Sequence, residues 1–152
     1  MKLSKLPRVI IILIPFIFGI GCSDKSSNSN DNIPAELVGT WMFSSGTIDG
    51  EPMTPENTNY ICESAVTHSM IFNSNGTWRE NLYDEGMSQV CWGSGTFTVN
   101  ADTLYLTETE FNGIPTSTPE ESEQMTFLVS GNQLFITSFD FSITVVLIYN
   151  RI

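Results

Sequence analysis

An alternating pattern of apolar side chains near the C-terminus most constrains the fold of this 152-residue chain. From Phe141 to Tyr149 every second residue is a large apolar one, and Ser142 and Thr144 separate the first three of them. Successive side chains of a β-strand point to opposite faces, so the pattern predicts a strand with one face against a core. We find no convincing helical periodicity after Leu37, and the sequence therefore predicts an all-β protein.

Seven further β-rich segments precede this one and are separated by turn residues. Together with the last segment, the predicted strands are 37–45, 68–73, 77–83, 91–99, 103–109, 124–130, 133–139 and 141–149. Short turns containing asparagine, glycine or aspartate join several neighbours as hairpins. The polar stretch 49–59 and the proline-containing stretch 112–123 are predicted to be longer loops.

Strands joined mostly by hairpins favour an antiparallel up-and-down meander. An open meander has two exposed edges, and closure into a barrel removes them. A closed barrel of eight strands has an interior that side chains fill or that holds one small ligand. A β-sandwich is the competing arrangement, because the number of strands does not exclude it. We predict the eight-stranded up-and-down barrel.

The first 21 residues form a separate segment. Lys2, Lys5 and Arg8 precede an apolar run from Val9 to Ile20 that only Pro15 interrupts. The run has 12 residues, whereas a helix that spans a bilayer takes roughly 20. A basic start before a short apolar run is typical of a secretory signal peptide.

The residues that follow this run, Gly19-Ile20-Gly21-Cys22 and then a polar stretch to Asn32, resemble a bacterial lipoprotein signal. The resemblance implies that the signal peptide comprises residues 1–21, that Cys22 carries three acyl chains and that residues 22–35 are a polar linker. Several chains give durable attachment, whereas a single chain binds a membrane only marginally. Ser23 resembles the default for outer-membrane sorting in well-studied enteric bacteria, and the choice between the periplasmic and the surface face stays open.

Residues 36–152 are the predicted domain, and four motifs in it carry a second resemblance. The motifs are residues 36–41 (ELVGTW), 72–78 (FNSNGTW), 95–97 (GTF) and 147–151 (LIYNR). In order and spacing they resemble the lipocalin-like domains found in bacterial lipoproteins. The resemblance implies a lipocalin-like barrel with Trp41 across its closed end and Arg151 packed over that tryptophan. It carries over no catalytic residue.

Cys62 and Cys91 are the two cysteines of the predicted domain. Export to an oxidising compartment favours a disulfide between them. If the hairpin turn centres near Asn75, strand pairing places Cys62 opposite roughly position 88, close to Cys91. Two reduced thiols or a redox site are the alternatives, but neither a CxxC spacing nor a neighbouring base supports redox chemistry. We predict a structural disulfide.

His68 is the only histidine of the chain, and no nucleophile motif such as Gly-x-Ser-x-Gly is present. We expect it to be partly exposed on the surface. We expect Glu108 and Glu110 to share one face of their strand, and the acids of 120–123 to line a loop without the regular ligand spacing of an EF-hand. These acids are interpreted as solvated, so we predict neither an enzyme nor a metal site.

The chain contains ten phenylalanines, four tyrosines and three tryptophans, and several of them alternate into the predicted interior. With Met70, these candidate ligand-binding residues are Trp41, Phe43, Phe72, Trp78, Phe97, Phe127, Phe141 and Tyr149. The simpler interpretation is that they fill the core. The functional interpretation is a cavity that receives an apolar small molecule at the open end, with Met70 as an adaptable wall.

Charge and anchoring complete the functional prediction. A formal net charge of −11 argues against nucleic-acid binding, which needs a basic surface. Removal of the signal leaves Lys25, Arg79 and Arg151 as the basic residues, so anionic lipid headgroups should repel the domain. We predict a lipoprotein of the cell envelope, anchored in the outer membrane, whose barrel binds or carries a small apolar ligand without a cofactor. The alternative is a non-enzymatic interaction or structural module that contacts an envelope protein through loops 49–64 and 112–123.

Overall fold

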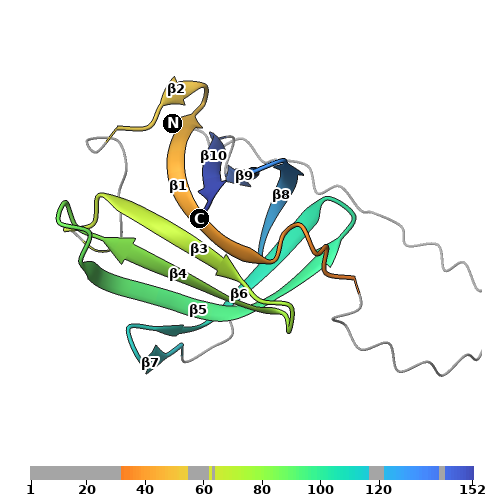
Figure 1. The fold of residues 1–152 in the computed structure, drawn as a ribbon, viewed down its shortest axis with the longest axis horizontal. Coiled ribbons are helices and arrows are strands. Elements are labelled where there is room, and N and C mark those ends of the chain that lie inside the picture. Colours follow the sequence, from red (N-terminus) through yellow and green to blue (C-terminus); the bar gives the residue numbers. More distant parts are fainter. Residues whose placement is uncertain (1–31, 55–61, 63, 117–121, 141–142) are drawn as a thin grey trace, which may run out of the picture.

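The computed structural model describes residues 32–54, 62, 64–116, 122–140 and 143–152 (Figure 1). Its eight long strands are β1 (Gly39–Ile48), β3 (Thr67–Phe72), β4 (Thr77–Tyr83), β5 (Gln89–Asn100), β6 (Thr103–Phe111), β8 (Glu123–Ser130), β9 (Gln133–Asp140) and β10 (Ile143–Arg151). Two strands of two residues, β2 (Glu51–Pro52) and β7 (Ile114–Pro115), are attached to β1 and β6. These described residues contain no helix of the length and apolarity that crossing a membrane requires.

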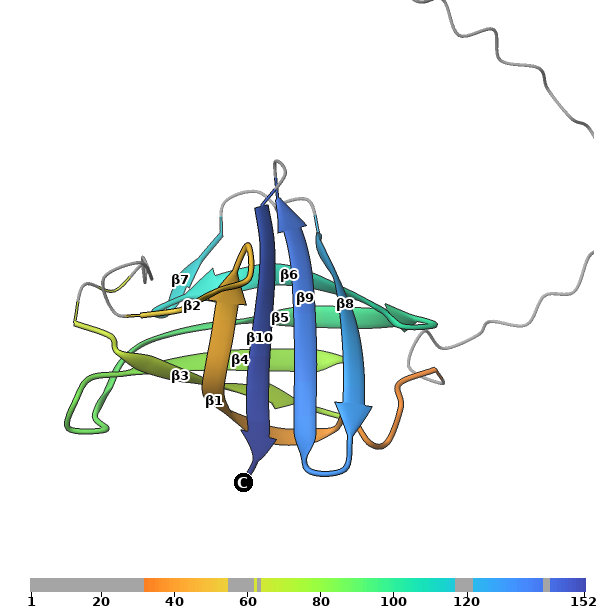
Figure 2. The same cartoon turned by 90° about the horizontal axis from the view of Figure 1, so that it is seen from above.

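The long strands form a closed antiparallel up-and-down barrel. Each one pairs with the next along the chain, and β10 pairs back onto β1 from Trp41↔Arg151 to Ile48↔Val145. Figure 2 shows β1, β10, β9 and β8 crossing in front of β3 to β6. This closure confirms the predicted eight-stranded barrel and excludes the β-sandwich.

Strand β1 joins the two halves of the barrel because it bends. Its register against β10 shifts between Phe43 and Ser45, and such an irregularity kinks a strand. The first part of β1 pairs with β3, from Gly39↔Phe72 to Met42↔Ser69. Figure 1 shows the resulting arc of β1 from the β3 side of the barrel to the β10 side.

The predicted strands agree with the observed ones apart from shifts at their ends. In both predicted loops, however, the chain first makes a tight hairpin and adds a two-residue strand. Asp49 and Gly50 precede β2 with φ of 51° and 85°, and Asn112 and Gly113 precede β7 with φ of 50° and 82°. Two consecutive residues with positive φ form the two-residue turn that best matches the twist of the paired strands in a β-hairpin.

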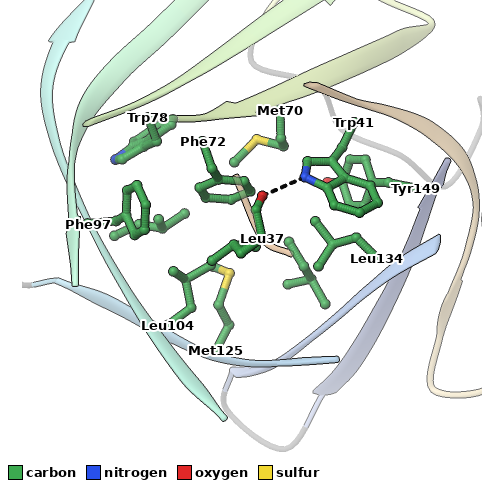
Figure 3. Packing of buried hydrophobic residues seen from close by; sticks show 12 residues of the cluster. Leu37, Trp41, Met70, Phe72, Trp78, Phe97, Leu104, Met125, Leu134 and Tyr149 are labelled. Atoms are coloured by element: carbon green, nitrogen blue, oxygen red, sulfur yellow. Dashed lines mark hydrogen bonds between the residues drawn. The ribbon is translucent and has the colours of Figure 1, made fainter. Parts of the chain in front are cut away.

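One end of the barrel is filled by a hydrophobic core, drawn in Figure 3. Its buried members are Leu37, Trp41, Met70, Phe72, Trp78, Phe97, Leu104, Leu106, Met125, Leu134, Ile136 and Tyr149. Phe72 and Phe97 meet edge to face at 5.2 Å between ring centroids, the arrangement that aromatic quadrupoles prefer. We call this filled end the closed end.

Trp41 and Arg151 seal the closed end as the resemblance implied. Trp41 is fully buried, and its indole N–H donates a 2.9 Å hydrogen bond to the carbonyl oxygen of Leu37. The guanidinium of Arg151 lies over the indole, 4.4 Å from the ring centroid, and donates to the carbonyl oxygens of Glu36 and Val38. A cation over an indole is a favourable contact that also shields the ring from water.

A smaller cluster lies at the opposite end, where β4 ends and β5 begins. Ala65, Leu82 and Cys91 are buried there, with Cys62 and Phe111 packed against them. Cys62 and Cys91 form a disulfide with their Cα atoms 6.6 Å apart, within the range that such a bond spans. The predicted pairing is confirmed.

Candidate ligand-binding site

The inward-facing side chains are apolar at the closed end, but from Glu80 toward the opposite end they include charged ones. Glu80 is paired with Met70 on β3 and with Gly93 on β5, and residues paired across strands share a face of the sheet. Met70 belongs to the core, so Glu80 points into the barrel. Its side chain nevertheless keeps 32% of its surface exposed. Solvent therefore reaches the interior at this end, which we call the open end.

Glu108 also faces the interior, and a β-bulge separates it from Glu110. The register between β5 and β6 shifts by one residue, so that Glu108 lies opposite Gly95 whereas Glu110 lies opposite Ser94. Gly95 is paired with the core residue Trp78 and therefore faces inward. Glu108 accordingly points in and Glu110 points out. The expectation that these two acids share a face is wrong, because an extra residue reverses the alternation.

Two glycines of β5 make room, one for the side chain of Glu108 and the other for the backbone of β6. A Cβ atom at position 93 would lie 2.9 Å from Oε2 of Glu108, which shows that this carboxylate covers the glycine. A Cβ atom at position 95 would collide with the backbone carbonyl of Thr107. Since Gly93 is also opposite Glu80, this glycine allows the two carboxyl groups to approach each other across β5.

A third carboxylate completes the cluster at the rim. Glu123 is the first residue of β8 rather than part of a loop, and it is exposed. It lies opposite the core residue Leu106, which places it on the interior face. Burial, followed by the negative charges of Glu123 and Glu108, raises the pKa of Glu80 to about 7. Glu80, Glu108 and Glu123 are called the acidic cluster below.

His68 lies beside the acidic cluster inside the barrel. It is only 4% exposed, so the expectation of a surface position is wrong. Its ring stacks on Phe43 at 4.8 Å, and its Nε2 atom forms a 2.8 Å hydrogen bond with the hydroxyl of Tyr149. Nε2 is also 3.9 Å from Oε1 of Glu80. Burial lowers the pKa of His68 to about 4, so the imidazole is neutral at pH 7 and this contact is not an ion pair.

The fold agrees with the comparison to known protein families. The family described as lipocalin-like domain matches residues 37–136. The chain belongs to the lipocalin-like domain family. This match confirms the lipocalin-like domain that the four motifs predicted.

The fold of this chain is also similar to that of a solved structure. The crystal structure of fatty-acid-binding protein 1 from Echinococcus granulosus is 11% identical, and the alignment covers 77% of this chain and 98% of that one with a TM-score of 0.42. A search of curated proteins finds no match to the chain.

The lipocalin-like domain places the predicted aromatic residues on its interior face. Six of the candidates are buried in the core, namely Trp41, Met70, Phe72, Trp78, Phe97 and Tyr149. Phe43 and Phe127 are partly buried and pack against that core, whereas Phe141 lies outside the described residues. Their inward orientation is confirmed for the described positions, and their contact with a ligand stays a prediction.

The sequence contained a signal for the inward position of His68 and of Glu80, but a weaker one for Glu108. His68 is in phase with Met70 and Phe72 along the predicted strand 68–73, and this phase alone would have placed it inside. Glu80 is likewise in phase with Trp78. The inward position of Glu108 depends on the bulge at Ser94 and Gly95; the glycines of 93–95 mark this stretch as prone to a bulge, but they do not say which strand carries the extra residue. In the part of the chain that is described, no group of three or more His, Cys, Asp or Glu residues could hold a metal ion.

Proposed function

We propose that this chain is a lipid-anchored protein of the cell envelope whose lipocalin-like barrel binds or carries a small apolar molecule. One observation carries the binding part of this proposal: the barrel is packed at one end, and solvent reaches an inward-facing side chain at the other. A small ligand that packs against the core from this end would have its apolar surface removed from water.

The partly accessible apolar side chains at the border of the core supply the contact surface. Phe43, Phe127 and Leu147 pack against the core from three different strands and retain accessible area. An apolar ligand that rests on them would extend the core toward the open end. The gain is about 25 cal/mol for each Å² of apolar surface removed from water.

Native mass spectrometry of the protein purified from its own membranes tests ligand binding directly. We expect a retained small molecule, and an increase in the denaturation midpoint when lipophilic molecules are added. Phe43→Ala should weaken both effects. Leu128→Ala is the matched control, because Leu128 is on the outer face of β8 and 61% exposed. A midpoint that no lipophilic molecule moves would contradict the binding proposal.

The anchoring part of the proposal depends on Cys22, which lies outside the described residues. The polar linker and the excess of acidic over basic residues would hold the domain away from an anionic membrane surface. Cys22→Ser should abolish the added mass of the acyl chains. The variant should also either leave the membrane fraction or retain its uncleaved signal peptide. An unmodified Cys22 in the wild-type protein would refute lipidation and leave the barrel's binding role untouched.

A further inference from the structure

The outer side of β8, β9, β10 and the second half of β1 forms a surface without charged side chains at its described positions. Residues that alternate with the buried Met125, Leu134 and Tyr149 point outward on these strands. Pairing with β10 extends this surface onto β1 beyond its bulge. The outward residues are Ser45, Thr47, Gln124, Thr126, Leu128, Ser130, Gln133, Phe135, Thr137, Phe139, Thr144, Val146, Ile148 and Asn150. We call this surface the neutral face.

Apolar side chains are adjacent to one another on the neutral face. Strand pairing places Phe135 between Leu128 and Ile148, and Val146 is the neighbouring outward residue on β10. Leu128 and Phe139 are 61% and 68% exposed. Figure 2 views this side of the barrel, and no described segment crosses β8, β9 or β10 in front of them. Contiguous exposed apolar area of this kind marks an interaction site.

The described acidic side chains surround the neutral face but are absent from it. They lie in the barrel interior, on the outer face of β6, or in and beside the turns and short segments at the two barrel ends: Glu36, Asp49, Glu51, Glu80, Asp84, Glu85, Asp102, Glu108, Glu110 and Glu123. Asp49 borders the face, where its carboxylate accepts a 2.8 Å hydrogen bond from the backbone N–H of Thr144. In a chain of formal net charge −11, this distribution leaves a broad uncharged area on the side of the barrel.

The neutral face is large enough for a weak but specific protein contact. Strands β8 and β9 have 8 residues each, and β10 has 9. With about 3.4 Å for each residue and about 4.8 Å between strands, the four strands cover at most about 27 by 19 Å, or about 500 Å². Two such faces in contact bury about 1,000 Å², which is near the lower limit of specific interfaces.

We propose that the neutral face is the contact surface of a dimer formed by two copies of this chain. A two-fold axis brings the same face of both copies together, so the face must be compatible with its own charges. Two copies with the same large negative charge repel each other wherever their carboxylates meet. On the neutral face, Leu128, Phe135 and Ile148 are instead removed from water while the carboxylates stay outside the contact. The contact lies on the side of the barrel and leaves both open ends accessible.

A partner of another kind fits this surface less well. A basic protein is attracted to acidic groups, which lie at the barrel ends and on the side of Glu110. An anionic lipid surface attracts basic residues, and the two described arginines are elsewhere. Arg151 covers Trp41 at the closed end, and Arg79 lies over Trp92 on the outer face of β4. A second copy, in contrast, supplies an uncharged face of the same size and the same strand geometry.

Cysteine cross-linking of the full-length protein in the cells that produce it tests the proposal. Thr137 lies on the neutral face between β8 and β10, and Thr98 is an exposed threonine on the outer face of β5. With a short bifunctional maleimide, Thr137→Cys should give at least about tenfold more covalent dimer than Thr98→Cys, because a specific contact brings the introduced thiols together in every dimer. Cys62 and Cys91 are joined to each other and do not compete.

A charged variant tests whether apolar contact holds the dimer together. Leu128→Glu places a carboxylate on the face of both copies and should weaken the dimer at least about tenfold, measured by the Thr137→Cys cross-link and by sedimentation velocity of the purified protein. Thr98→Glu adds the same charge on the other side of the barrel and should change neither measurement. Circular dichroism shows whether both variants fold; if Leu128→Glu does not, the comparison of Thr137→Cys with Thr98→Cys decides.

Several results would overturn the dimer and leave the proposed ligand binding untouched. Equal cross-linking through Thr137→Cys and Thr98→Cys would show random collision, and a dimer that Leu128→Glu does not weaken would place the contact elsewhere. A cross-link of Thr137→Cys only to a protein of different mass would assign the face to another partner. Absence of a cross-link, including the case in which lipid shields the new thiol from the maleimide, would exclude the second copy. A dimer whose denaturation midpoint no lipophilic molecule moves would support this inference and contradict the binding proposal.

Discussion

Replacement of Glu80 by glutamine should stabilise the protein at alkaline pH and have little effect at acidic pH. The pKa of Glu80 is about 7 in the folded protein and about 4.5 in its unfolded reference. The folded state therefore binds the proton more tightly, and stability falls as pH rises from about 4.5 to about 7. Glutamine mimics the protonated carboxyl group and removes this loss.

The size of the effect follows from the pKa shift and the exposure of the side chain. A shift from 4.5 to about 7 corresponds to about 3 kcal/mol as an upper bound. About a third of the side chain is reached by solvent, which screens the charge. We therefore expect Glu80→Gln to raise the free energy of unfolding by about 1–2 kcal/mol above pH 8.

Urea denaturation at about pH 5 and about pH 8.5 measures this difference. His68, whose folded pKa is lowered to about 4, makes the protein less stable as pH falls from about 6.5 to about 4, but it does so equally in both proteins. The difference between variant and wild type thus isolates Glu80. Glu110→Gln is the control and should show no such pH-dependent gain. A gain that is equal at both pH values, or absent at pH 8.5, would refute the raised pKa that partial burial and the neighbouring negative charges give Glu80.

Three further predictions concern the scaffold. Trp41→Ala should lower the free energy of unfolding by about 3–5 kcal/mol, because it empties a fully buried position; a loss below about 1 kcal/mol in urea denaturation would contradict tight packing at the closed end. Replacing Cys62 and Cys91 together by alanine should cost about 3–4 kcal/mol in the chain-entropy model, measured against the oxidised wild type; free thiols in the purified wild-type protein would show that the bond is absent. Gly95→Ala places a methyl group against the backbone carbonyl of Thr107 and should sharply reduce the yield of folded protein, as judged by circular dichroism. If the variant instead has the melting curve of the wild-type protein, β5 and β6 can move apart at this position.

Much of the scaffold could be predicted from the sequence, because its signals are local. Alternation at 141–149 and turn residues between the segments identified eight strands, and hairpin connections favoured a closed meander. The motif that contains Trp41 and the closing motif that contains Arg151 predicted the contact that seals the barrel. The pairing of Cys62 with Cys91 followed from counting across a hairpin. The strands need only the chain and one assumption about strand pairing, whereas the disulfide also rested on expected export and the contact of Trp41 with Arg151 was implied by the resemblance to lipocalin-like domains.

The sequence by itself determined the strands and their order, and the family resemblance supplied the sealed end, whereas only the tertiary structure decided that Glu108 faces the open end. Alternation along one strand assumes that no residue is inserted, and the bulge between β5 and β6 breaks that assumption, so Glu108 turns inward while Glu110 stays outside. The approach of Glu108 to Glu80 further requires the space above Gly93, which exists only once three strands are paired. The barrel's closure then buries His68 and raises the pKa of Glu80, because solvent access to a side chain depends on all the strands around it and not on its neighbours in the chain.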